Sequence, residues 1–356
     1  MELISPRRGG PAAWIAAGAI LVAAASCARS IRPGGGPEDR TPPVVVAVSP
    51  ESLAVGVPRD ADLRIMFSEP IERASLDRGL WISPPLVPDK ISVSGEEARI
   101  SLREPLPEST SVQVALTTVV QDIRRNPLAE PYTWMFSTGD SIARGRVRGT
   151  VERVGGGASG QVLVALYPVL ADTLPDPRVE APRAITQAGT EGVFSLGGLD
   201  PDGTVYLLYA MVDRDGNREI VGRGEYYTAV PDSVTVVSDR LDVQTTLRLV
   251  DPEAPSTLQG TLTRAPDDSV AVWVALYAAD DDSLRAARHS AKTDTTGAYR
   301  IRGVAPATYR MIGFCDGDEN GRRDPADLWL ELDPALVVPP GEEMDLGERA
   351  GPRCLP

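Results

Sequence analysis

Two stretches of this chain match each other in order and in character. The segment "RGTVERVGGGASGQVLVALYP" (148–168) parallels "QGTLTRAPDDSVAVWVALYA" (259–278), and "GVFSLGGLDPDGTVYLLYAMVDRDGN" (192–217) parallels "GAYRIRGVAPATYRMIGFCDGDENG" (297–321). Two copies of about 100 residues are too long for the repeats of a solenoid and have the length of tandem domains. The repeat therefore predicts at least two domains of the same fold in this chain.

Each copy consists of short apolar runs separated by turn residues. The runs are rich in Val, Leu and Tyr, and many of the chain's 33 glycines and 32 prolines recur between them. Short strands at regular spacing, joined by tight turns, favour a β-sandwich. Residues 43–140 show the same pattern in runs such as "ADLRIMFSEPI" and "TSVQVALTT". The sequence predicts an all-β chain of three tandem sandwiches, at residues 43–140, 143–250 and 255–350.

The amino terminus differs in character from the rest of the chain. Arg7 and Arg8 precede the apolar run "PAAWIAAGAILVAAAS" and Cys27. A basic start and an apolar stretch shorter than the roughly 20 residues of a membrane-spanning helix predict a signal peptide, residues 1–26, that is cleaved. The Gly- and Pro-rich residues 27–42 predict a flexible tether.

The residues Ala24-Ala25-Ser26-Cys27 resemble the lipobox of bacterial lipoproteins, although Ala24 stands where leucine or valine is usual. The resemblance implies that Cys27 becomes the lipid-modified first residue of the mature chain, and that Ala28 permits export to the outer membrane. We then expect a lipoprotein of the cell envelope at the outer membrane, facing either the periplasm or the cell surface. An ordinary secretory signal with a chance cysteine is the alternative.

Residues 48–76 and 119–140 resemble the SbsA-type bacterial Ig-like domain of surface-layer and cell-surface proteins. The second of these segments, "VVQDIRRNPLAEPYTWMFSTGD", contains the matching residues Asp122 and Asn126. Arg125 stands where this family usually has a glycine, so the turn around it must close in another way. The resemblance implies an Ig-like sandwich directly after the tether.

The two repeated copies resemble the carboxypeptidase regulatory-like, or transthyretin-like, seven-stranded sandwich. In the second copy the matching features are Gly260-Thr261, Val274 with Leu276, and the run from Thr295 to Tyr309. Domains of this family accompany a peptidase but carry no zinc ligands of their own. The resemblance therefore implies no peptidase activity for this chain.

The charge balance and the scarcity of catalytic residue types exclude several functions. The formal net charge is −14 and the isoelectric point is near 4.7, whereas a nucleic-acid partner needs a basic stripe. The single histidine, His289, has no nucleophile in its sequence context, and the chain has no His-Glu-x-x-His run. The segment 155–160 has the spacing G-x-G-x-x-G, but a strand follows it where a dinucleotide site needs a helix. We expect no enzyme and no nucleic-acid partner.

One acidic run matches a calcium-binding loop, because oxygen-bearing residues alternate in it and a glycine holds the sixth position. The predicted ligands are Asp316, Asp318, Asn320, Arg322 (through its main-chain oxygen), Asp324 and Asp327. The equivalent loop of the first copy keeps Asp213, Asp215 and Asn217, but Arg218 replaces the glycine and Glu225 comes one residue late. Calcium is thus the one cofactor that the sequence predicts. The alternative is that Asp, Asn and Gly simply form turns here.

The cysteine count indicates a disulfide. The chain has three cysteines, and if Cys27 is acylated, Cys315 and Cys354 remain as an even pair in an oxidising compartment. Their disulfide would attach the carboxyl terminus to the last sandwich. Two unpaired buried thiols are the alternative.

We expect the protein to act as a non-enzymatic structural or adhesion module of the envelope. Its partners would be the membrane, through the lipid, and envelope proteins or glycans. The alternative is a carbohydrate- or peptide-binding accessory subunit of an envelope complex. Exposed aromatic residues would favour glycan binding, and Trp81, Trp273 and Trp329 are the candidates, with Trp273 more plausible as a core or sheet-face residue.

Overall fold

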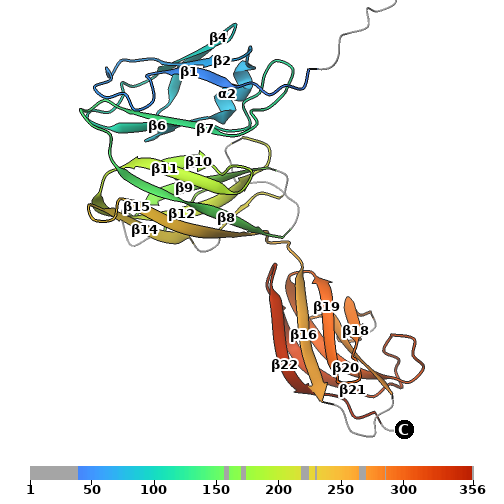
Figure 1. Cartoon of the computed structure of the whole chain (residues 1–356). Coiled ribbons are helices and arrows are strands. Elements are labelled where there is room, and N and C mark those ends of the chain that lie inside the picture. Colours follow the sequence, from blue (N-terminus) through green and yellow to red (C-terminus); the bar gives the residue numbers. More distant parts are fainter. Residues whose placement is uncertain are drawn as a thin grey trace, which may run out of the picture. The chain divides into compact units, whose positions relative to one another are not determined.

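The computed structural model describes residues 39–155, 160–169, 174–217, 224–228, 231–263, 270–284 and 286–354. Within them the chain is almost entirely β-strand, with a short helix α2 (Arg73–Gly79) (Figure 1). The strands form several separate sheets that make up β-sandwich domains, so the predicted all-β fold class is confirmed. The chain divides into a unit of residues 1–40 and a unit of residues 41–356.

The predicted leader lies outside the described residues. This applies to the signal peptide 1–26, to the lipidation site Cys27 and to most of the tether 27–42. In the part of the chain that the structure describes, none of the helices has both the length and the apolar character needed to cross a membrane.

The first sandwich has seven strands in two sheets. These strands are β1 (Val45–Ser49), β2 (Leu63–Phe67), β3 (Leu80–Ser83), β4 (Pro88–Ser94), β5 (Glu97–Leu102), β6 (Ser111–Leu116) and β7 (Tyr132–Ser137). One sheet has the order β1-β2-β5-β4 and the other β3-β6-β7. In β2, Leu63, Ile65 and Phe67 are buried while Arg64 is exposed, because alternate side chains of a strand point to opposite faces.

Strand β6 departs from this alternation, since all six of its residues are buried. Val112 and Val114 belong to the core of the first sandwich. On the opposite face, the Oγ of Ser111 accepts a hydrogen bond from Ala143 N, and the Oε1 of Gln113 accepts one from Gly197 N. Both faces of β6 are therefore covered, one by its own domain and one by the residues that follow.

The second sandwich is built from the first copy of the repeat. Its strands are β8 (Gly145–Val154), β9 (Gln161–Pro168), β10 (Ala184–Gln187), β11 (Val193–Leu199), β12 (Asp202–Asp213), β13 (Tyr226–Tyr227), β14 (Asp232–Val237) and β15 (Asp242–Val250). One sheet has the order β10-β9-β12-β13, with β14 also pairing with β12, and the other has the order β11-β8-β15. A continuous apolar core fills the space between the two sheets.

The third sandwich is built from the second copy. Its seven strands are β16 (Ser256–Thr263), β17 (Ala271–Ala278), β18 (His289–Lys292), β19 (Ala298–Val304), β20 (Ala307–Asp316), β21 (Trp329–Val338) and β22 (Glu343–Ala350). The sheet orders are β19-β16-β22 and β18-β17-β20-β21. The first strand pairs in parallel with the last, β16 with β22, as β8 does with β15. The sequence repeat thus corresponds to a repeated topology.

A pair of equivalent glycines shows how closely the two copies agree. Gly192 and Gly297 have φ angles of +77° and +86°, in the region that favours glycine. A Cβ added to Gly192 would lie 2.6 Å from the carbonyl oxygen of Val151. A Cβ added to Gly297 would lie 2.0 Å from the carbonyl oxygen of Leu262. Both glycines also accept a 2.9 Å hydrogen bond from the N–H of that same neighbour. The glycine that begins "GVFSL" and "GAYRI" is therefore required by the close approach of the first strand.

The structure joins Cys315 and Cys354 by a disulfide, with 5.6 Å between their Cα atoms. Cys315 lies near the end of β20, and both cysteines are buried in the core of the third sandwich. The bond therefore fixes the residues after β22 to that core.

Candidate functional site

Buried polar side chains join the first sandwich to the second, within residues 41–356. The Oε1 of Gln113 accepts the 2.9 Å hydrogen bond from Gly197 N, and that of Gln187 accepts a 2.7 Å bond from Thr118 N. The amide of Gln187 donates in turn to the Oγ1 of Thr118. Since a buried polar group without a partner costs about 1–3 kcal/mol, these bonds favour one specific arrangement of the two surfaces.

An apolar cluster lies on the outer face of the β9–β12 sheet. Its buried members are Leu163, Ala165, Tyr167, Ile185, Leu207, Tyr209 and Met211. Trp81, a residue of β3, packs against this cluster and is only partly exposed. Trp81 therefore takes part in the contact between the sandwiches, which leaves less of its ring available to stack on a sugar.

A cavity of about 540 Å³ lies where these two sandwiches meet. This volume is in the range of about 300–1,000 Å³ typical of small-molecule sites. Its lining includes the charged residues Glu130, Arg153 and Glu191 as well as the amide side chains of Gln161 and Gln187. The lining residues that the structure describes include no aromatic ring, so the cavity suits a polar ligand better than a stacked sugar ring.

The other two tryptophan candidates lie in the third sandwich. Trp273 packs against a buried cluster on the outer face of β17 and β20 and is partly buried. Trp329 is 44% exposed, and the guanidinium carbon of Arg323 lies 5.6 Å from the centroid of its ring. Trp81 and Trp273 are both less exposed, so Trp329 is the most accessible of the three rings.

The acidic loop of the third sandwich is closed by its own hydrogen bonds. The buried carboxylate of Asp316 accepts bonds from Asn320 N (3.2 Å) and Gly321 N (2.8 Å). The side-chain oxygen of Asn320 accepts from Arg322 N at 2.7 Å. Such side-chain-to-backbone bonds are typical of Asx turns.

The remaining predicted ligands of this loop also contact one another. The amide of Asn320 donates to Asp318 (2.7 Å) and Asp324 (3.1 Å), and Asp324 N donates to Asp327 (2.7 Å). Across the described part of the chain, the groups of three acidic side chains with carboxylate oxygens within 4.8 Å of one another do not include this loop. Calcium at this loop stays a prediction.

The equivalent loop of the second sandwich does bring three carboxylates together. One oxygen from each of Asp213, Asp215 and Glu225 lies within 4.8 Å of the others. Asn217, predicted as a third ligand, donates to Asp215 through its backbone N–H (3.0 Å) and its side-chain amide (3.1 Å), and its role as a ligand stays a prediction. The spacing of a calcium loop puts the last ligand at position 224, which is a glycine here, whereas the structure brings in the next residue, Glu225, just before β13.

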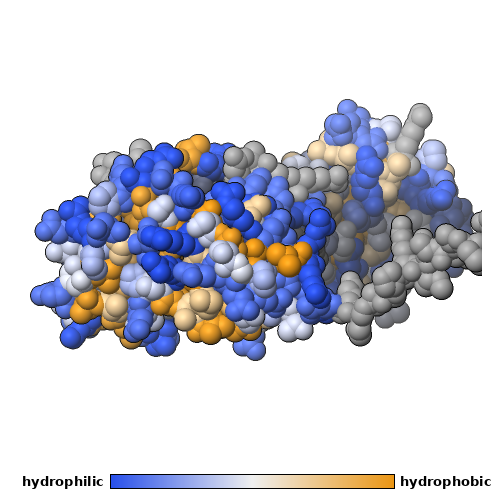
Figure 2. Space-filling view, turned by 90° about the horizontal axis from the view of Figure 1, so that it is seen from above, coloured by the Kyte–Doolittle hydropathy of each residue, from blue (hydrophilic) through white to orange (hydrophobic). Residues whose placement is uncertain are grey.

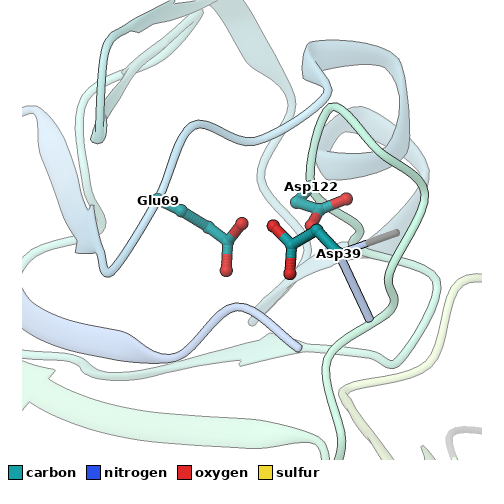
Figure 3. Close-up of side chains that lie close together, drawn as sticks. All are labelled: Asp39, Glu69 and Asp122. Atoms are coloured by element: carbon teal, nitrogen blue, oxygen red, sulfur yellow. The ribbon is translucent and has the colours of Figure 1, made fainter. Parts of the chain in front are cut away.

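A further acidic pair lies in the first sandwich. Figure 3 shows Glu69 and Asp122, drawn together with Asp39. Asp39 belongs to the unit of residues 1–40, whereas Glu69 and Asp122 belong to the unit of residues 41–356. Asp122 is fully buried, and its carboxylate accepts bonds from Arg124 N (2.7 Å) and from the backbone (2.8 Å) and side-chain (2.8 Å) nitrogens of Asn126. Burial acts to raise the pKa of Asp122, but these bonds and one with Glu69 outweigh it and hold the pKa below its usual value.

This aspartate also explains how the turn closes without the usual glycine. Arg125 has a φ of 73°, a left-handed conformation that glycine adopts at no steric cost. The carboxylate of Asp122 holds the residues on both sides of Arg125 in place through the bonds to Arg124 and Asn126. Asp122 therefore has a structural role in this turn.

His289, the single histidine, lies in β18 with its ring 6.1 Å from that of Tyr309, edge to face. Partial burial lowers its pKa below the ordinary value, which favours the neutral imidazole at pH 7. Its neighbour in the structure is thus an aromatic ring.

Comparison with solved structures finds similarity at low identity. The TIE protein of Bacillus anthracis is 12% identical with a TM-score of 0.23, over 88% of this chain and 58% of that chain. The N-terminal part of the bacterial S-layer protein SbsC is 13% identical with a TM-score of 0.23, over 55% of this chain and 44% of that chain. An L,D-transpeptidase from Mycobacterium smegmatis is 13% identical with a TM-score of 0.22, over 58% of this chain and 90% of that chain. At these scores the likeness carries no argument about function, and this chain spans little more than half of the TIE protein.

Comparison of sequences is informative for the first sandwich. No curated protein matches the chain. A family model does match, over residues 39–138, and these include all seven strands of the first sandwich. The family that these residues match is the bacterial Ig-like domain, and the first sandwich is called the Ig-like domain below.

Proposed function

We propose that this chain is a non-enzymatic lipoprotein of the bacterial cell envelope. A lipid on Cys27 anchors it at the outer membrane, and residues 27–42 form the tether to the domains. The Ig-like domain is of the SbsA type, and the second and third sandwiches are transthyretin-like. The three domains act as a structural or adhesion module that contacts other envelope components.

The observation that carries this proposal is a bacterial Ig-like domain with one sheet face buried against the next sandwich. Domains in one chain move relative to each other by default, unless a substantial interface restrains them. Here Gln113 and Gln187 are buried and hydrogen-bonded across the contact, and Trp81 packs on the apolar cluster beside them. A restrained pair of domains transmits force and holds a binding surface at a fixed distance, as a structural module must.

The environment of the usual catalytic residue types supports a non-enzymatic role. A nucleophilic cysteine acts as a thiolate, whereas Cys315 and Cys354 are joined in a disulfide. His289 packs against Tyr309, and its imidazole is not directed at a serine or cysteine by any hydrogen bond among the described residues. These groups serve the fold of the third sandwich.

The surface of the Ig-like domain fits a protein that stays soluble around its anchor. Figure 2 shows this face covered largely by hydrophilic residues, with apolar residues in separate small groups. Exposed apolar residues include Val46 (64%), Leu53 (67%) and Ile123 (66%). Small separate groups of this kind occur on ordinary protein surfaces, so contacts through this face would be mainly polar.

The test is chemical crosslinking in intact cells, followed by mass-spectrometric identification of the neighbours. We expect membrane-associated envelope proteins to be crosslinked to the wild-type chain and to be lost from a Cys27→Ala variant. Crosslinks to cytoplasmic proteins, or a chain recovered in the soluble fraction with no envelope neighbour, would contradict the proposal.

A second candidate function, binding of a polar peptide or glycan as an accessory subunit, is favoured by the cavity between the first two sandwiches. Arg153 and Glu130 place opposite charges on its lining. A library of envelope-derived peptides and oligosaccharides would be screened for binding to the wild type and to Arg153→Ala. Binding that the variant abolishes would support this function, and equal binding by both proteins would place the ligand elsewhere.

A further inference from the structure

We propose that the second sandwich binds a calcium ion through Asp213, Asp215 and Glu225, with the side-chain oxygen of Gln161 as a fourth ligand. Bound calcium would also order the contact of this loop with the Ig-like domain. This inference goes beyond the structural role proposed above, since it assigns a ligand to a specific site.

The three carboxylates converge from different parts of the fold. Asp213 ends strand β12 and is almost completely buried, Asp215 follows two residues later on the surface, and Glu225 directly precedes β13. Their oxygens lie within 4.8 Å of one another. Because strands β12 and β13 pair with each other, the sheet itself keeps Glu225 beside the other two.

An independent observation comes from Gln161, the first residue of β9, which is only 8% exposed. Its Nε2 donates a 2.9 Å hydrogen bond to the Oδ2 of Asp213, so the side chain points at the acidic group. Its Oε1 is buried and has no hydrogen-bond partner among the residues that the structure describes. A buried amide atom without a partner costs free energy, so the described residues leave the amide of Gln161 only partly satisfied.

The amide of Gln161 can present either atom to the site. The oxygen and nitrogen share one carbon, and half a turn about the last side-chain bond exchanges them. With the oxygen facing Asp213, Gln161 and the acidic residues supply four oxygens from side chains alone. Calcium takes six to eight oxygen ligands in a flexible geometry, so water or main-chain oxygens complete the set.

The charges of the group also favour a cation. Backbone N–H groups offset the carboxylates in part: Gly216 N donates to Asp213 (2.8 Å) and Arg214 N donates to Glu225 (3.1 Å). Each of these N–H groups stabilises one carboxylate but carries no net charge. The negative charges of the three carboxylates therefore still repel one another. A divalent ion between the three carboxylates removes that repulsion directly.

The same loop lies against the Ig-like domain. Gly216 has a φ of 72°, and an added Cβ would lie 2.8 Å from the Cγ2 of Val119. The residues next to Val119 belong to the contact already described, since Thr118 N donates to Gln187. A cation that orders Asp213 and Asp215 would therefore also restrain Gly216 against Val119.

Calcium titration by calorimetry into the chelated, full-length protein tests the site. We expect saturable binding that Asp215→Asn and Glu225→Gln each weaken by at least about tenfold, because even loss of an outer-sphere partner typically costs 10–100-fold in metal affinity. Asp239→Asn, an exposed acidic residue in the turn between β14 and β15 of the same sandwich, is the matched control and should leave this binding unchanged. Both Asp215 and Asp239 are exposed, so neither change removes core packing.

Hydrogen exchange with and without calcium tests the second part. We expect slower exchange at residues 213–217 and 117–121 of the wild type when calcium is bound, and no such difference in Glu225→Gln. Absence of saturable binding, or binding that Asp215→Asn and Glu225→Gln weaken no more than Asp239→Asn does, would overturn the site. Binding without slower exchange at 117–121 would overturn the coupling to the Ig-like domain.

Discussion

Replacing Gly297 by alanine tests the close approach between β16 and β19 in the third sandwich. The added Cβ would lie 2.0 Å from the backbone oxygen of Leu262, far inside van der Waals contact. The two strands would have to move apart, which weakens the 2.9 Å bond from Leu262 N to Gly297 O. Overpacking typically costs about 1–3 kcal/mol and a lost hydrogen bond about 1 kcal/mol.

Gly303 provides the matched control in the same domain. Its φ is +70°, so Gly303→Ala carries about the same backbone cost as Gly297→Ala, about 1–2 kcal/mol for a left-handed conformation. In both variants alanine also lowers the entropy of the unfolded chain, which offsets about 0.4–1 kcal/mol of that cost. An added Cβ at Gly303 meets no atom within 4 Å. The difference between the two variants therefore isolates the clash with Leu262, and we expect Gly297→Ala to be less stable than Gly303→Ala by at least about 2 kcal/mol.

Hydrogen exchange measured by mass spectrometry is the suitable assay, because it reports the opening free energy of each domain separately. Peptides from β16 and β19 should exchange at least about 30-fold faster in Gly297→Ala than in Gly303→Ala, since 1.4 kcal/mol is a factor of ten. Peptides from β2 and β5, in the Ig-like domain, should be unchanged in both. Equal exchange of the two variants within a factor of about two would refute the reasoning.

Three further predictions concern the disulfide, the left-handed turn and the pH dependence. Replacing Cys315 and Cys354 by serine should lower the free energy of unfolding of the third sandwich by about 4 kcal/mol, the chain-entropy value for a separation of 39 residues. Urea denaturation measures this loss, and a loss below about 1 kcal/mol would contradict the prediction. Arg125→Gly should raise the melting temperature of the Ig-like domain, since glycine relieves a φ of 73°, and a lower melting temperature would contradict this. Because the pKa of Asp122 is lowered in the folded state, its contribution is present above the unfolded pKa of about 4 and is lost as pH falls through the folded pKa. The melting temperature should therefore fall more steeply between pH 7 and pH 3 for the wild type than for Asp122→Asn. An equal fall in both proteins would argue against this role of Asp122.

Much of the fold could be predicted because strand signals are local. The alternation of Leu63, Arg64 and Ile65 in β2 identifies a half-buried strand, and the alignment of Gly192 with Gly297 identifies equivalent positions of two similar domains. These patterns depend on residues near one another in the sequence or on the internal repeat, and both are visible without coordinates.

The candidate site could be predicted only in part, because its partners are distant in the sequence. Asp213 and Asp215 stand in a recognisable alternation, but Gln161 reaches them from the neighbouring strand β9. Glu225 is brought in by strand pairing rather than by its position in the loop. Gln113 resembles an outward polar residue of a strand, and only the packing of the second sandwich shows that it is buried.

The most direct test of the proposed function is lipid labelling of the chain in growing cells. Cells given an alkyne-tagged fatty acid should label the wild-type protein, and mass spectrometry of the mature chain should find Cys27 as its acylated first residue. The Cys27→Ala variant should lose both the label and its association with membranes. A variant that is still labelled, or that still partitions with membranes as the wild type does, would contradict the account.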